Sequence, residues 1–160
     1  MTGEQIGSWI LDRELGKGGM GIVYLAHHVD SSKQPNQAAI KVLALEHAMD
    51  ESIHERFQRE IAVLGRLKHA NIVRLLDYGE EKGRAFYAME YVDGVSFQTL
   101  LNQHQRLPWD EVLDMAMQVC QALKHAHNHG IVHRDLKPSN LLRSNDDSRV
   151  VKLTDFGVAW

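Results

Sequence analysis

The stretch His133-Arg134-Asp135-Leu136-Lys137-Pro138-Ser139-Asn140 decides how this chain is interpreted. It fills every fixed position of the pattern H-R-D-L-x-x-x-N. Two short apolar runs follow, Asn140 to Arg143 and Val150 to Leu153, and the polar turn between them predicts a hairpin. Asp155-Phe156-Gly157 comes directly after that hairpin. A single triplet arises easily by chance, but an ordered set of motifs on predicted loops and strands does not.

Upstream of this stretch the pattern is helical. Pro108, Trp109, Asp110 and Glu111 open the helix with acid in its first turn, and Gly130 ends it as a C′ residue. We predict an apolar stripe made of Val112, Ala116, Val119, Cys120 and Leu123. The only cysteine, Cys120, falls in that stripe, so we interpret it as a small core residue rather than a nucleophile.

The first half of the chain predicts strands around one helix. Apolar residues Ile53, Phe57, Ile61 and Leu64 recur at spacings of three and four and define the buried face of the helix. The turn Glu80-Glu81-Lys82-Gly83 joins the last two strands, and Val92-Asp93-Gly94 reads as a linker between two lobes. The five predicted strands are Trp9 to Leu15, Ile22 to Val29, Ala38 to Ala44, Val73 to Tyr78 and Arg84 to Tyr91.

A glycine cluster lies between the first two strands. Gly16 to Val23 fits G-x-G-x-x-G-x-V, a spacing that dinucleotide-binding Rossmann loops share. A Rossmann loop runs into a helix, whereas Ile22-Val23-Tyr24 is a poor helix start, so the strand-loop-strand context favours a loop that lies over nucleotide phosphates. On the cluster alone, a plain glycine hairpin stays open as an alternative.

Lys41 and Glu60 are a candidate ion pair. Lys41 ends the run Ala38-Ala39-Ile40-Lys41, and a lysine inside an apolar strand is costly to bury without a partner. Glu60 lies beside the apolar face of the following helix and is the partner we expect. The alternative is two unrelated surface charges.

Together these motifs resemble the protein kinase superfamily, and the glycine loop Gly16 to Tyr24 is similar to that of bacterial serine/threonine kinases of the eukaryotic (Hanks) type. The resemblance implies an α+β fold, with an N-lobe of a five-stranded antiparallel sheet plus one helix, and then a truncated, mainly helical C-lobe. The implied divisions are a partial kinase domain over 1–160, with the N-lobe at 9–91, the hinge at 92–94 and the start of the C-lobe at 95–160.

The resemblance also implies a function and its residues. The implied activity is that of a non-specific serine/threonine protein kinase, which transfers the ATP γ-phosphoryl group to protein hydroxyls in signal transduction, with Mg²⁺ held by Asn140 and Asp155. Lys137 is the choice typical of serine/threonine kinases, and Arg134 is typical of kinases activated by phosphorylation. Ser96 departs from the acid that contacts ribose in many relatives. The implied catalytic residues are Lys41, Glu60, Asp135, Lys137, Asn140 and Asp155; the implied nucleotide-binding residues are Leu15, Gly16, Lys17, Gly18, Gly19, Met20, Gly21, Val23, Ala39, Lys41, Met89, Glu90, Val92 and Leu142.

Composition is that of an ordinary globular protein, with 44% hydrophobic and 24% charged residues and a formal net charge of −3. This balance gives no reason to expect a nucleic-acid or membrane partner. One cysteine and no apolar stretch of membrane-spanning length favour the cytoplasm, although sequence outside this chain could tether the protein. ATP and a serine- or threonine-containing protein are the expected partners.

Three alternatives remain open from the sequence. A pseudokinase would use the same fold for scaffolding, although the presence of Lys41, Asp135, Asn140 and Asp155 favours an enzyme. A zinc site at His125 and His129 lacks an evident third ligand. The chain is either a fragment or itself a short gene product; because it ends soon after Asp155-Phe156-Gly157, we expect it to be inactive alone.

Overall fold

The computed structural model describes residues 2–18, 20–44 and 50–156. The chain forms two compact units, and each is described by itself. Met1–Ile61 and Leu75–Tyr91 make the first unit, and Ala62–Arg74 and Val92–Trp160 make the second.

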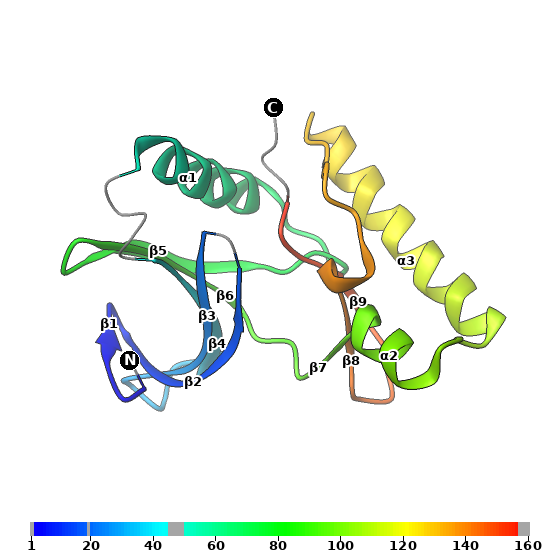
Figure 1. Cartoon of the computed structure of the whole chain (residues 1–160), viewed down its shortest axis with the longest axis horizontal. Coiled ribbons are helices and arrows are strands. Elements are labelled where there is room, and N and C mark those ends of the chain that lie inside the picture. The colour runs from blue at the N-terminus through cyan, green and yellow to red at the C-terminus, as the bar shows by residue number, and fades with distance from the viewer. Residues whose placement is uncertain (1, 19, 45–49, 157–160) are drawn as a thin grey trace. The chain divides into compact units, whose positions relative to one another are not determined.

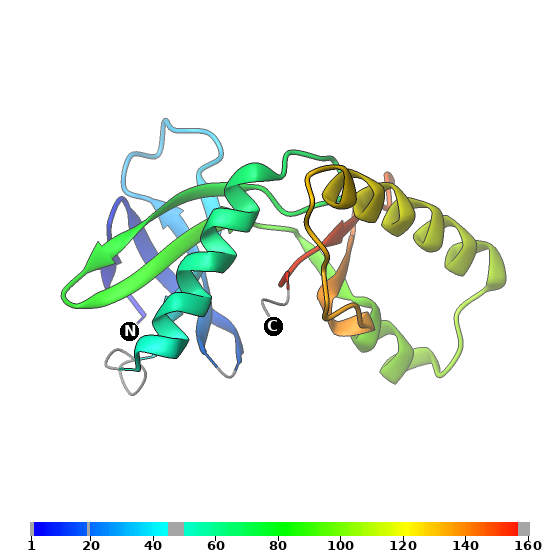
Figure 2. The same ribbon diagram turned by 90° about the horizontal axis from the view of Figure 1, so that it is seen from above.

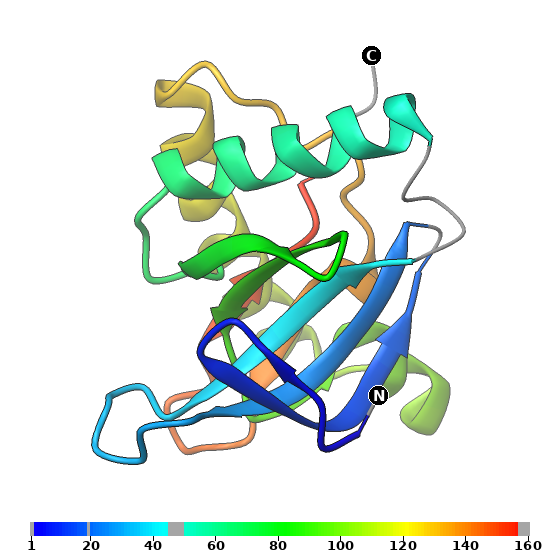
Figure 3. The ribbon, with the colours of Figure 1, turned by 90° about the vertical axis from the view of Figure 1, so that its left-hand side faces the viewer.

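An antiparallel sheet forms the first unit, with the strand order β1-β2-β3-β4-β6-β5 (Figures 1 and 3). All five predicted strands are present, and β1 adds a two-residue sixth strand that the sequence pattern does not reveal. The bounds are β1 Gln5–Ile6, β2 Trp9–Lys17, β3 Gly21–His28, β4 Gln37–Leu43, β5 Leu75–Glu81 and β6 Arg84–Glu90, with helix α1 at Glu51–Arg66 between β4 and β5.

Strand β4 is central and is buried on both faces from Ala38 to Leu43. Side chains alternate along a strand, so its residues divide between two layers. One layer packs against α1 (Figure 2). There the Phe57 ring lies 5.2 Å from the Tyr87 ring of β6. The other layer is an apolar core made of Ile6, Trp9, Leu11, Tyr24, Ala26, Ala38, Ile40, Val42, Phe86 and Ala88.

The connection between β5 and β6 is tighter than predicted. Glu80 and Glu81 belong to β5, so the turn contains only Lys82 and Gly83. Both residues have positive φ, 51° and 74°, as a two-residue hairpin turn that matches strand twist requires. Glycine adopts this conformation without steric cost, which explains Gly83 in the second turn position.

The second unit contains a three-stranded antiparallel sheet, β7-β8-β9, and two helices (Figure 1). The strands β8 and β9 confirm the predicted hairpin, whereas β7 and α2 were not predicted. Ser96 begins α2 as its N-cap, because its hydroxyl accepts the Thr99 backbone N–H. The bounds are β7 Gly94–Ser96, α2 Phe97–His104, α3 Trp109–Asn128, the 3₁₀ turn η2 Pro138–Asn140, β8 Leu141–Ser144 and β9 Val151–Leu153.

Helix α3 has the predicted bounds, but of its predicted stripe only Val119 is buried, and the interpretation of Cys120 as a core residue is wrong. The buried residues of α3 are Val119, Ala122 and Ala126, whereas Cys120 is exposed. Apolar residues cover a wide arc of this helix, so spacing alone does not select a face. The part of that arc turned toward β9 is the one that becomes buried. Val112 and Ala116 are exposed and Leu123 is partly buried.

Candidate active site

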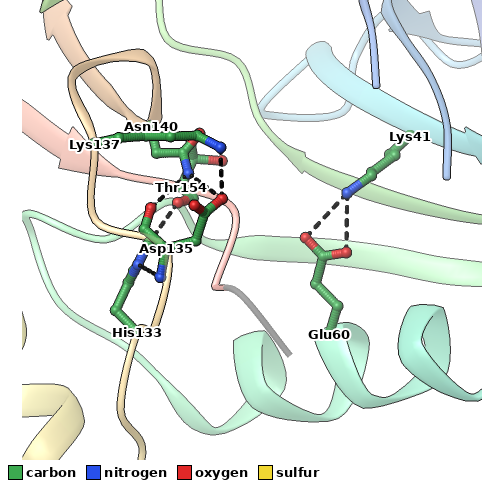
Figure 4. Close-up of polar contacts among 7 residues, drawn as sticks. All are labelled: Lys41, Glu60, His133, Asp135, Lys137, Asn140 and Thr154. Carbon is green, nitrogen blue, oxygen red and sulfur yellow. Dashed lines mark hydrogen bonds and ion pairs between the residues drawn. The ribbon is translucent and has the colours of Figure 1, made fainter. Parts of the chain in front are cut away.

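The Lys41–Glu60 pair that the sequence predicts is present in the first unit (Figure 4). The Lys41 ammonium lies 2.9 Å and 3.1 Å from the two carboxylate oxygens of Glu60. Lys41 comes from β4 and Glu60 from α1, and their side chains are only 9% and 2% exposed. The Lys41 ammonium also lies 5.7 Å from the centre of the Tyr87 ring. Pairing therefore allows two charges to remain inside an apolar layer.

Strand register gathers further predicted nucleotide residues around Lys41. Residues directly opposite each other in antiparallel strands place their side chains on the same face. Val23 lies opposite Lys41, and Ala39 lies opposite Met89. Ala39 and Lys41 are two apart on β4 and share a face. Val23, Ala39, Lys41 and Met89 thus line one face of the sheet.

The glycine loop joins β2 to β3. The Gly18 N–H donates to the Gly21 carbonyl at 2.9 Å, which closes the loop on itself. At Gly21, an added Cβ would lie 2.2 Å from the Val42 carbonyl oxygen, so only glycine fits against β4. At Gly16 there is open space within 4 Å of an added Cβ. Gly19 lies outside the described residues. The two glycines therefore differ: the fold itself requires Gly21 but not Gly16.

We expect Gly21→Ala to lower the free energy of unfolding by about 1–3 kcal/mol, because the new methyl group forces β3 away from β4. Gly16→Ala is the matched control and should change it by no more than about 0.5 kcal/mol. Urea unfolding of the two variants measures both values. Equal stability of the two variants would contradict the packing role of Gly21.

In the second unit, the loop before β8 brings together three predicted catalytic residues (Figure 4). The Lys137 ammonium lies 2.8 Å from the Asp135 carboxylate. The Asn140 side-chain amide donates to the backbone carbonyl of Asp135 at 2.9 Å and to its carboxylate at 3.1 Å. The hydrogen bond from Lys137, supported by the one from Asn140, holds the pKa of Asp135 below its usual value. Asp135 is therefore an ionised hydrogen-bond acceptor at neutral pH.

His133 fixes this loop to the segment that follows β9. Its Nε2 donates to the Thr154 carbonyl at 3.0 Å, and its Nδ1 accepts the Asp135 N–H at 3.2 Å. Burial lowers the pKa of His133, so the ring is neutral and holds one proton, on Nε2. The Thr154 N–H donates to the Asn140 carbonyl at 3.0 Å, and the Phe156 ring lies 4.7 Å from the His133 ring. The segment from His133 to Asn140 and the segment that contains Asp155 and Phe156 are thus held together through Thr154.

Asp155 follows directly and adopts a left-handed backbone conformation with φ of 52°. Arg134 is also left-handed, with φ of 63°. Such conformations are uncommon for residues other than glycine and persist where surrounding contacts impose them, often at functional sites. Gly157, the last residue of the predicted motif, lies outside the described residues.

The remaining predicted residues lie on separate elements. Leu15 and Lys17 are at the exposed end of β2, and Glu90 ends β6. Met20 precedes β3, and its carbonyl accepts the Ala44 N–H at 3.2 Å. In the second unit, Val92 precedes β7, and Leu142 of β8 pairs with Ser96 of β7. Ser96 uses its hydroxyl to cap α2, which gives this departure from the family pattern a structural role.

Sequence reasoning missed Thr154 and a polar network around Asn71. Thr154 acts through its backbone N–H and C=O, which carry no side-chain pattern. The Asn71 side chain donates to Gln118 of α3 at 2.8 Å and to the Val151 carbonyl at 2.9 Å. The Gln118 side-chain oxygen also accepts the Val151 N–H at 2.8 Å. Residues distant in sequence make these contacts, and no short motif reveals them.

The sequence of this chain is similar to those of known proteins. Residues 9–160 match the protein kinase domain family, so the chain belongs to the protein kinase family. It is 41% identical over 160 residues to the probable serine/threonine-protein kinase PknB of Lactococcus lactis, covering 97% of this chain and 25% of that protein. It is 38% identical to the serine/threonine-protein kinase PrkC of Bacillus subtilis, covering 99% and 24%. The chain thus spans about a quarter of these relatives.

Solved structures agree on the fold. The crystal structure of the Mycobacterium tuberculosis PknI kinase domain has a TM-score of 0.81 and 37% identity, with 100% of this chain and 64% of that chain covered. A double mutant of the same kinase domain gives a TM-score of 0.83 at 36% identity, with 100% and 62% covered. The predicted α+β kinase fold is therefore confirmed. Protein kinases as a family use ATP and Mg²⁺.

Proposed function

We propose that this chain carries the nucleotide-binding and catalytic-loop residues of a serine/threonine protein kinase. The observation that carries the proposal is the arrangement in the second unit, where Asp135, Lys137 and Asn140 contact one another. Thr154, the residue before Asp155, is hydrogen-bonded to the same loop through His133 and Asn140. An acid, a cation and an amide in one ordered loop suit phosphoryl transfer, in which positioning and electrostatics supply most of the rate.

In the first unit, the proposed role of Lys41 is to hold the α- and β-phosphates of ATP, with Glu60 keeping its ammonium in place. Val23, Ala39 and Met89 offer an apolar surface to the adenine ring. Glu90 at the end of β6 offers backbone groups to its polar edge. Val92, which belongs to the second unit and to the proposed hinge at 92–94, is assigned the same role. Because Gly16 leaves open space, we assign this glycine to close approach of the loop backbone to phosphate oxygens.

In the second unit, Asp135 accepts the hydrogen bond of the substrate hydroxyl and orients its oxygen toward the γ-phosphorus. Because its pKa is lowered, Asp135 is a weak base. It therefore positions the hydroxyl first and receives the proton late, once the phosphorus–oxygen bond is forming. Lys137, already 2.8 Å from Asp135, neutralises charge on the transferred group.

The chain has suitable oxygen ligands for Mg²⁺. The side-chain amide nitrogen of Asn140 donates to Asp135, so the side-chain oxygen of Asn140 is the atom that could bind the ion. Asp155 supplies a carboxylate. Hard oxygen donors are the ligands that Mg²⁺ prefers. When bound, Mg²⁺ would neutralise and orient the ATP phosphates; Asn140 and Asp155 are the residues that would hold it.

The second candidate function is that of a pseudokinase, which uses the same fold for scaffolding. Measurement of ATP binding tests the proposed Mg²⁺ and nucleotide site. We expect Asp155→Ala to abolish the Mg²⁺-dependent part of ATP binding, because it removes the carboxylate ligand. Isothermal titration of the 160-residue chain with ATP, with and without Mg²⁺, measures this. Asp147→Ala, on the exposed β8–β9 turn, is the matched control and should bind as the original chain does. Mg²⁺-dependent binding that survives Asp155→Ala would contradict the assignment.

The proposed partners are ATP and a protein with an accessible serine or threonine. Phosphoamino-acid analysis of a generic basic protein, incubated with labelled ATP and the complete gene product, identifies the acceptor residue. Label on tyrosine alone would contradict the serine/threonine class. Among residues 2–18, 20–44 and 50–156, no helix combines the length and apolar character that crossing a membrane requires.

A further inference from the structure

Three histidines of the second unit stack outside the candidate active site. His69 lies in the segment that follows α1, His125 lies in the last turn of α3, and His129 caps that helix. The His69 and His125 rings are 5.1 Å apart, and the His125 and His129 rings are 4.5 Å apart. Within the described ranges, no group of three or more potential ligands is arranged to hold a metal ion. The rings are thus in contact as aromatic groups.

Hydrogen bonds fix which nitrogen carries a proton in two rings of this stack. The Asn71 N–H donates to His69 Nδ1 at 3.0 Å, so this nitrogen carries no proton. His129 Nδ1 donates to the His125 carbonyl at 2.8 Å, because a carbonyl can only accept. His125 Nε2 is buried and has no hydrogen-bond partner in the described part of the chain. Protonating His69 removes the acceptor of the Asn71 N–H.

Charged groups also lie near the stack. Arg66 of α1 donates its guanidinium to the His129 carbonyl at 2.9 Å. Lys152 of β9 and His125 both act on His69. Burial is the largest cause that lowers the pKa of His69, and these two cationic or potentially cationic neighbours lower it further.

Asn71 connects the stack to strand β9. Its side chain donates to Gln118 and to the Val151 carbonyl, and its own carbonyl accepts the Leu153 N–H at 2.9 Å. Strand β9 leads directly to Thr154 and Asp155. We propose that the stack of His69, His125 and His129 is a pH-sensitive latch, which holds the segment after α1 against α3 and β9 while His69 is neutral and releases it when His69 is protonated.

The direction of the pH effect follows from His69. Its folded pKa lies below the value of about 6.5 that an unfolded chain has, so the unfolded or opened state binds protons first as pH falls. The latch is therefore fully stable above about pH 7. Its stability is lost as pH falls through about 6.5, until the lower folded pKa is reached.

Hydrogen exchange of the Leu153 amide tests the latch, because this N–H donates to Asn71. After correction for intrinsic exchange rates, its protection relative to Ile40 of the other unit should fall several-fold between pH 7.5 and pH 5.5. In His69→Asn this pH dependence should disappear, because the asparagine oxygen can accept the Asn71 N–H and does not titrate. His127→Asn, the same change at an exposed histidine of α3, should behave as the original chain.

Equal pH dependence in the original chain and His69→Asn would overturn the proposal. So would loss of the pH dependence in His127→Asn. If His69→Asn does not fold, nuclear magnetic resonance of the original chain decides the question. The expected result is a His69 ring with its proton on Nε2 at pH 7.5, and Asn71 and Leu153 amide shifts that titrate together with it. Amide shifts that titrate independently of His69 would refute the latch.

Discussion

Asp135→Asn should lower the rate of phosphoryl transfer by a factor of about 10² to 10⁴, the span usual for loss of a general base, while ATP affinity stays nearly unchanged. Asparagine keeps the shape of the side chain and offers an oxygen to Asn140, so the loop should remain ordered. It cannot receive the substrate proton, and it loses the charge that attracts Lys137. Labelled phosphate transfer by the complete gene product, with ATP titration alongside, measures both quantities.

Asp147→Asn is the matched control, since it makes the same chemical change on the exposed β8–β9 turn. It should leave both transfer and ATP binding unchanged. The assigned role of Asp135 is wrong if Asp135→Asn turns over at the original rate. A parallel loss of transfer and ATP affinity would point instead to a damaged nucleotide site.

Lys41→Met should destabilise the chain by about 3–5 kcal/mol, because it leaves the Glu60 carboxylate buried without its partner. The Glu60 side chain is 2% exposed, so water cannot replace the lost ammonium. ATP affinity should fall in the same variant, because the proposed phosphate ligand is removed. Urea unfolding and ATP titration measure the two effects.

A second variant separates the ion pair from the packing around it. Lys41→Met combined with Glu60→Leu removes both charges, and we expect it to recover part of the stability that Lys41→Met loses. ATP affinity should not recover. Lys82→Met is the matched control, because Lys82 is 65% exposed and lies 3.8 Å from Glu4; its loss should cost about 0–1 kcal/mol. Equal effects of Lys41→Met and Lys82→Met would contradict a buried role for the Lys41–Glu60 pair.

The sequence by itself predicted the elements whose signals are local. Five strands and the long helices follow from alternation and helical spacing, and the pairing of Lys41 with Glu60 follows from the cost of a charge in an apolar strand. The catalytic loop was evident because its functional side chains lie within one short segment. The roles of the site residues stay predictions that the variants above test.

Only the tertiary structure decided which residues of the predicted helices, strands and loops contact one another. The buried face of α3 depends on β9, so Cys120 is exposed although helical spacing placed it in the core. Gly21 differs from Gly16 because the Val42 carbonyl approaches one and not the other. Thr154 joins the two motifs through backbone atoms that every residue type possesses. The histidine stack joins residues from separate segments, and the protonation of His69 depends on burial and neighbouring charge, which a linear pattern does not contain.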